Sequence, residues 1–71
     1  MKYNYSKLKG RIVEKYNSNA RFADKVGVSN VYLSGILNNK RGLTRDNIVK
    51  WSDALGIDKT EIGEYFFNVE V

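Results

Sequence analysis

Apolar residues recur at spacings of three and four along most of the chain, which is the period of an amphipathic helix. The first such segment spans about residues 5–16, and either Asn4 or Ser6 can cap its start. Its apolar face consists of Tyr5, Leu8, Ile12 and Tyr16. Gly10 weakens this helix by about 1 kcal/mol relative to alanine, and marks either a close neighbour or an exposed weak point. The opposite face, which we expect to be solvated, carries Lys7, Lys9, Arg11 and Lys15.

Two short helices separated by a sharp break come next. Residues 19–26 form the first, preceded by Ser18 as N-cap and stopped by Gly27, a residue suited to the left-handed position after a helix. Its inner stripe is Phe22, Ala23 and Val26. The second helix begins after Ser29, another good N-cap. Its apolar positions are Val31 or Tyr32, Leu33, Ile36 and Leu37. The polar run 38–42 then predicts a loop.

The remaining pattern predicts two more helices and no sheet. A fourth helix follows Thr44 and ends at Gly56, with an inner face of Ile48, Trp51 and Leu55. Asp58 and Glu61 have the spacing of a capping box and open a fifth helix. Its inward residues are Ile62, Tyr65 and Phe66, whereas Phe67 is expected to be partly exposed. No useful length of chain alternates with period two. We therefore predict an all-α fold with five helices in a single domain, residues 1–71.

Composition argues against several classes of function. The chain has no cysteine and no histidine, so the commonest general base, the thiol nucleophile and the usual transition-metal ligands are missing. The acidic residues are scattered, and we expect no enzyme activity, no cofactor and no metal site. No apolar run approaches the ~20 residues needed to span a bilayer, and the N-terminus lacks the apolar segment of a secretory signal. We expect a cytoplasmic protein.

Charge is distributed unevenly along the chain. The net charge is +4, but residues 1–57 hold eleven Lys/Arg against four Asp/Glu, whereas residues 58–71 hold one lysine against four acids. A basic body with an acidic end is typical of a surface that binds a polyanion and keeps a separate rear face. A merely solubilising surface gives the same pattern.

The stretch ADKVGVSN, residues 23–30, has the residues that a tight helix-turn-helix corner needs. Ala23 is small enough to let two helices approach closely, and Gly27 tolerates a positive φ where the chain reverses. Val28 fills the corner from inside, and Ser29 caps the next helix. Leu33 and Ile36 anchor that helix from beneath, which leaves a face of Asn30, Ser34 and Asn38 outside.

These positions resemble the helix-turn-helix of the Cro and phage-repressor family, also called the xenobiotic-response-element family. The likeness rests on Ala23, Gly27, Val28, Ser29, Leu33 and Ile36, and continues through the loop and the helix that ends in ALGI. It covers roughly residues 5–67. The resemblance implies a five-helix, lambda-repressor-like DNA-binding domain with its motif at about 19–38. It also implies a phage or prophage regulator of transcription that binds double-stranded operator DNA as a weak homodimer.

The resemblance further implies which residues would meet DNA. Those facing the bases would be Asn30, Val31, Ser34, Gly35 and Asn38, and those near the phosphates would be Asn19, Ser29, Tyr32, Lys40, Arg41 and Arg45. Asparagine can pair bidentately with adenine, and valine can meet a thymine methyl. Helix N-termini can offer backbone N–H groups to phosphates, and Lys40, Arg41 and Arg45 can neutralise several of them.

The third helix departs from a strong base reader, and this supports a second hypothesis. It has no Arg, Lys or Gln before the loop, and Gly35 stands where the family often places a contacting side chain. Temperate phages also encode small helix-turn-helix antirepressors that bind the cognate repressor, in some cases through the surface that would meet DNA. The apolar side chains of Val31 and Tyr32 are compatible with such a protein-binding face. The acidic, aromatic segment 61–71 is a further candidate contact.

Overall fold

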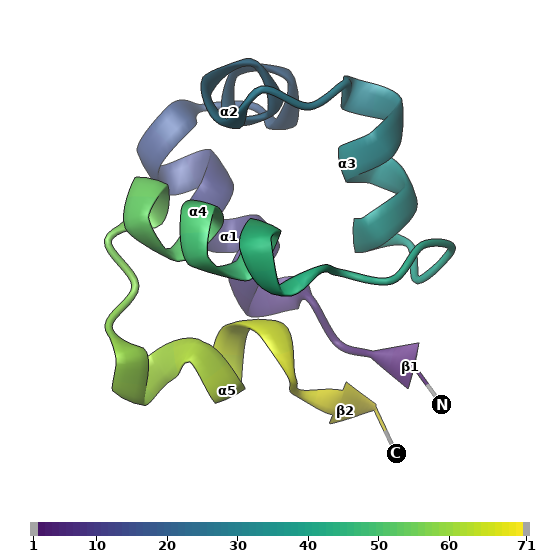
Figure 1. Cartoon of the computed structure of the whole chain (residues 1–71), viewed down its shortest axis with the longest axis vertical. Helices are drawn as coiled ribbons and strands as arrows, with labels where there is room; N and C mark the ends of the chain where they lie inside the picture. The colour runs from purple at the N-terminus through teal and green to yellow at the C-terminus, as the bar shows by residue number, and fades with distance from the viewer. Residues whose placement is uncertain (1, 71) are drawn as a thin grey trace.

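The computed structural model describes residues 2–70, and five α-helices account for most of them (Figure 1). The helices are α1 (Ser6–Tyr16), α2 (Asn19–Val26), α3 (Asn30–Leu37), α4 (Arg45–Leu55) and α5 (Ile62–Phe66). A single 3₁₀ turn, η1 (Lys59–Glu61), leads into α5. Helices α2 and α3 meet steeply at the top of the view and form the helix-turn-helix. The predicted all-α, five-helix fold is thus confirmed.

Aromatic and branched side chains from all five helices form one core. The fully buried side chains are Trp51, Phe22, Phe66, Leu8, Ile12, Leu33, Ile36 and Leu55. Phe22 of α2 meets Trp51 of α4 edge to face, with ring centroids 5.5 Å apart, a favoured aromatic geometry. The apolar faces read from the spacing of three and four are therefore largely the buried faces. The exception is Val31, which is 77% exposed, so Tyr32 packs on the core instead.

The predicted helix ends are observed for α2, α3 and α4. The side-chain oxygens of Ser18, Ser29 and Thr44 each accept a hydrogen bond from the backbone N–H of the third residue of the helix that follows, as N-cap residues do. Gly27 and Gly56 follow α2 and α4 with φ of 78° and 65°. These left-handed positions explain why the two helices stop at glycine.

The first and last helices differ from the prediction at their starts. Helix α1 begins at Ser6 rather than Tyr5, and the Ser6 N–H donates to Asn4 Oδ1 at 2.9 Å. At the other end, Asp58 accepts from the Lys59 N–H at 2.8 Å, but the chain first forms η1 and only then the short α5. The Asp58 side chain thus accepts from Lys59 rather than from the Glu61 N–H, and no hydrogen bond from the Asp58 N–H to the Glu61 side chain is found among residues 2–69, so the predicted capping box does not form.

The prediction of no sheet is wrong. Strands β1 (Lys2–Tyr3) and β2 (Val69–Glu70) pair antiparallel, with Tyr3 opposite Val69, and bring the two ends of the chain side by side (Figure 1). The Asn4 N–H extends the ladder by donating to Asn68 O at 2.6 Å. Two-residue strands are too short to show any alternation, so their pairing depends on where α1 and α5 place the chain ends.

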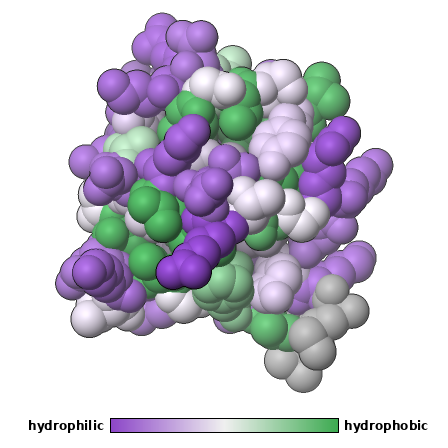
Figure 2. All heavy atoms as spheres, in the orientation of Figure 1, coloured by the Kyte–Doolittle hydropathy of each residue, from purple (hydrophilic) through white to green (hydrophobic). Residues whose placement is uncertain are grey.

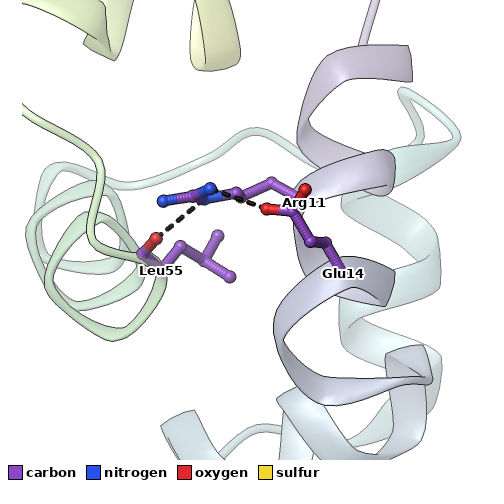
Figure 3. A network of polar contacts seen from close by, with 3 residues as sticks. All are labelled: Arg11, Glu14 and Leu55. Atoms are coloured by element: carbon purple, nitrogen blue, oxygen red, sulfur yellow. Dashed lines mark hydrogen bonds and ion pairs between the residues drawn. The ribbon is translucent and has the colours of Figure 1, made fainter.

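The expectation that the whole basic face of α1 is solvated is wrong for Arg11. Its side chain is 28% exposed. Nε donates to Leu55 O at 2.9 Å, and Nη1 donates to Glu14 Oε1 at 2.7 Å (Figure 3). The guanidinium thus binds a carbonyl at the C-terminus of α4, where a positive charge is favoured. Gly10 meets no atom within 4 Å of an added Cβ, so it is the exposed weak point rather than a close contact.

Polar side chains gather along the edge formed by α3 and the loop that follows it (Figure 2). Between residues 2 and 70, no helix combines the length and the apolar character that crossing a membrane requires.

Candidate interaction surface on the helix-turn-helix

The corner between α2 and α3 is tight, as its sequence predicts. Ala23 is 2% exposed, and its carbonyl accepts the Val28 N–H at 2.9 Å. Val28 is half-buried and packs on the core. The Ser29 hydroxyl oxygen accepts the Tyr32 N–H at 3.0 Å. The corner therefore fixes α3 on the domain with one face against the core and the other turned outward.

The outward face of α3 and the start of the next loop line one hollow of about 620 Å³. Its lining residues are Asn30, Val31, Ser34, Gly35, Asn38, Lys40 and Arg41. The structure thus brings together all five residues predicted to face the bases and two of those predicted to lie near phosphates. Ser29 and Tyr32 border a separate shallow depression with Val28 and Asn47. Asn19 and Arg45 stand exposed at the first positions of α2 and α4.

Part of the polar capacity of this face is used within α3 itself. Asn38 Nδ2 donates to Ser34 Oγ at 3.2 Å, so two of the candidate contact residues bind one another. Gly35 contributes no side chain. Asn30 lies exposed in the first turn, next to the exposed side chain of Val31. The face therefore carries one exposed apolar side chain, Val31, in its first turn, a bare Gly35 near its middle and polar groups at its two ends.

Arg41 lies against α3 at Gly35. An added Cβ at Gly35 would come within 3.1 Å of Arg41 Cδ and 3.3 Å of its Cγ and Nε. The guanidinium carbon is 5.5 Å from the centroid of the Tyr32 ring, within the range of a cation–π interaction. The Tyr32 hydroxyl accepts a hydrogen bond from Asn47 Nδ2 at 3.0 Å. One arginine from the loop is thus packed against α3.

The loop after α3 is anchored at two further points. The N–H groups of Lys40 and Arg41 both donate to Gly35 O, at 2.8 and 3.2 Å. Asn39 has a positive φ of 61°, and its amide group binds both the N–H and the C=O of Tyr3. Sequence reasoning missed Asn39, Asn47 and Tyr3. A weak signal existed for Asn39, because asparagine is the commonest non-glycine residue at left-handed positions.

Three basic residues follow α3, two in the loop and one at the start of α4. Lys40, Arg41 and Arg45 are exposed, and the ion pairs found within residues 2–69 join other groups: Lys7 with Glu64, and Arg11 with Glu14. The contact with Glu64 raises the pKa of Lys7, chiefly through a hydrogen bond between the two side chains. The positive charge beside the hollow is therefore not neutralised within this part of the chain.

Comparisons with known proteins agree with this architecture. A family model described as a protein of unknown function (DUF739) matches residues 1–69. No curated protein sequence matches the chain significantly. Among solved structures, the chain is similar to the solution structure of the modulator of repression (MOR) of the temperate bacteriophage TP901-1 from Lactococcus lactis. The TM-score is 0.84 and the identity 38%, over 100% of this chain and 96% of that one.

Proposed function

This chain belongs to the DUF739 family, and we propose from its likeness to a phage modulator of repression that it modulates repression by binding the cognate phage repressor. The binding surface in this proposal is the outward face of α3. The observation that carries it is the exposed Val31 in the first turn of α3, 77% accessible, which lines the hollow on that face. An exposed apolar side chain with polar groups around it is typical of protein interfaces.

The polar inventory of the face supports the same choice. Good bidentate contacts to bases come from Arg, Lys, Asn or Gln. Here Asn38 already donates to Ser34, and Gly35 has nothing to offer. Asn30 alone remains as an uncommitted amide on α3. Binding to a protein depends more on complementary shape and apolar contact than on a fixed pattern of hydrogen-bond donors and acceptors. This surface therefore suits a protein partner better than it suits DNA.

We assign roles to the candidate residues on this basis. The contact surface consists of Asn30, Val31, Ser34, Gly35 and Asn38, and the rim consists of Asn19, Ser29, Tyr32, Lys40, Arg41 and Arg45. In this role the protein is a single domain, residues 1–71, that acts in the bacterial cytoplasm and catalyses no reaction. It needs no cofactor, because recognition alone would keep the repressor from its operator.

Operator DNA is the second candidate partner, and the charge of the loop favours it. Lys40 and Arg41 border the same hollow as α3, and residues 1–57 carry a large excess of basic groups. In this version a Cro-like regulator binds as a weak homodimer, with α3 in the major groove and the basic side chains on phosphates. Its affinity would then fall steeply with salt.

Two binding assays on the same preparation distinguish the candidates. The purified protein is titrated against the neighbouring repressor and, separately, against DNA from the adjacent control region at about 50 and 200 mM salt. We expect a complex with the repressor at both salt concentrations and weak, sequence-independent binding to DNA. Specific binding to DNA without any complex with the repressor would overturn the proposal in favour of a Cro-like regulator.

A further inference from the structure

We propose that Arg41 is the anchor of the α3 surface and that it binds a carboxylate of an aspartate or glutamate on the partner protein. This rests on the proposed function, because it names the chemistry by which the same surface would recognise a repressor. The starting observation is that the arginine comes from the loop, yet its side chain lies along α3 and lines the same hollow as Val31.

Two residues, Gly35 and Tyr32, hold the side chain in this place, and a third, Asn47, holds Tyr32. The Gly35 carbonyl accepts the backbone N–H of Arg41 at 3.2 Å, and the bare Cα of Gly35 leaves room for its methylene groups. The ring of Tyr32 supports the guanidinium from one side, and Asn47 holds the Tyr32 hydroxyl. The contact with Arg41 explains why a glycine occupies this position, since alanine would otherwise stabilise the helix there.

A side chain held in this way is ready to bind an anion. Arg41 is exposed, and no ion pair engages it within residues 2–69. Its planar fork matches a carboxylate bidentately and retains that ability while one face stacks on an aromatic ring. Because part of its rotamer freedom is already lost in the free protein, less conformational entropy remains to be lost on binding.

The surroundings favour a protein carboxylate over a DNA phosphate. Phosphate contacts position a protein on the duplex, while side chains projecting from the recognition helix read the bases. Here Gly35 projects nothing and Arg41 occupies the space beside it. On the same hollow, Val31 presents an apolar side chain. A charged anchor next to an apolar contact is the arrangement of energetically dominant residues at protein interfaces, where arginine is enriched.

The first test measures binding of the neighbouring repressor by calorimetry. Arg41→Ala is expected to weaken the affinity at least about tenfold, and Arg41→Lys to recover only a small part, because lysine cannot form the bidentate contact. Lys50→Ala is the matched control, since it removes one exposed positive charge of α4 outside the hollow and is expected to change the affinity less than about threefold. Equal losses for Lys50→Ala and Arg41→Ala would overturn the proposal in favour of a diffuse charge effect.

A pair of glycine substitutions separates binding from folding. Gly35→Ala is expected to keep or raise the Tm, because alanine favours helix, while it displaces Arg41 and weakens repressor binding several-fold. Gly10→Ala makes the same change in α1, where an added Cβ meets nothing within 4 Å. It is expected to raise the Tm by up to about 4–8 °C and leave binding unchanged. If Gly35→Ala bound the repressor as tightly as the wild-type protein, the proposed role of Arg41 packed against Gly35 would be contradicted.

Charge reversal identifies the partner group directly. Arg41→Glu should abolish the complex, and replacing one acidic residue of the repressor by lysine should restore it at least tenfold. If no such lysine substitution in the repressor restored binding of Arg41→Glu, the carboxylate assignment would be overturned. The proposed function would still stand as long as the wild-type protein forms a complex with the repressor. If the wild-type protein binds operator DNA and no repressor, and Arg41→Ala weakens that binding, the ligand is a phosphate and both proposals fail.

Discussion

Asn39 and Tyr3 are joined by two hydrogen bonds between a side-chain amide and a backbone peptide unit. The Tyr3 N–H donates to Asn39 Oδ1 at 2.8 Å, and Asn39 Nδ2 donates to Tyr3 O at 2.9 Å. Strand β1 is thereby bound on one side by β2 and on the other by the loop that follows α3. The paired strands β1 and β2 and the loop after α3 form one continuous structure.

Replacing Asn39 by glycine tests this link. Glycine retains the positive φ of 61° at no steric penalty but removes both hydrogen bonds. We expect the amide of Tyr3 to exchange its hydrogen about fivefold faster, which corresponds to the ~1 kcal/mol net value of a hydrogen bond. Asn17→Gly is the control, because Asn17 also has a positive φ, of 69°. Equal exchange rates at Tyr3 in both variants would show that the link contributes nothing.

Arg11 is expected to stabilise the fold through the end of α4. Arg11→Met keeps the aliphatic stem and removes the donor to Leu55 O. Because a charged hydrogen bond and a favourable interaction with a helix C-terminus are lost together, we expect the free energy of unfolding to fall by about 1–2 kcal/mol. Lys9→Met, at an exposed position of the same helix, should change it by less than about 0.5 kcal/mol in a urea titration. Similar values for both variants would contradict this role.

Tyr5 should make stability depend on pH in alkaline solution. Burial raises its pKa above the usual 10.0, with a smaller contribution from Tyr3. Above about pH 10 the unfolded chain therefore loses the phenolic proton before the folded chain does, and the free energy of unfolding falls as the pH rises. Tyr5→Phe has no such proton. Its stability should fall less steeply between the usual pKa and the raised one, as measured by urea titrations at several pH values. Identical slopes would contradict the raised pKa.

Much of the fold could be read from the sequence because local signals were strong. Ser18, Ser29 and Thr44 are good N-caps directly before apolar periodic runs, and each caps a helix. The two strands were missed because two residues carry no period. Arg11 was placed in solvent because its spacing on α1 says nothing about a carbonyl 44 residues away.

The site was partly accessible to the same reasoning. The outward face of α3 follows from its period, and its five candidate residues do line one hollow. The position of the Arg41 side chain could not be predicted, because residues in a loop have no regular spacing that fixes where their side chains point. Gly35 was read as a missing contact, whereas in the structure it accommodates Arg41. The contribution of Asn47 could not be predicted either, because it depends on a contact with Tyr32, which is distant in the sequence.

Val31 should be essential for binding and dispensable for folding. Val31→Asp places a charge in the lining of the hollow, and we expect the affinity for the repressor to fall at least about thirtyfold, as for the strongest positions of an interface. Because the side chain is exposed, the Tm should change little. Val49→Asp is the control, since Val49 is another helical valine, 61% exposed, outside the hollow. An equal loss of affinity in both variants would point to a nonspecific charge effect.

The central claim is that α3 is the surface that binds a repressor, and NMR shift mapping tests it most directly. The isotope-labelled protein is titrated with the unlabelled neighbouring repressor, and the backbone amide signals are followed. We predict that the largest shifts or losses of signal fall on residues 30–41, while the amide signals of η1 and α5 keep their positions and intensities. Changes confined to α5 and β2, with the α3 signals unaltered in a complex of the same affinity, would contradict the account.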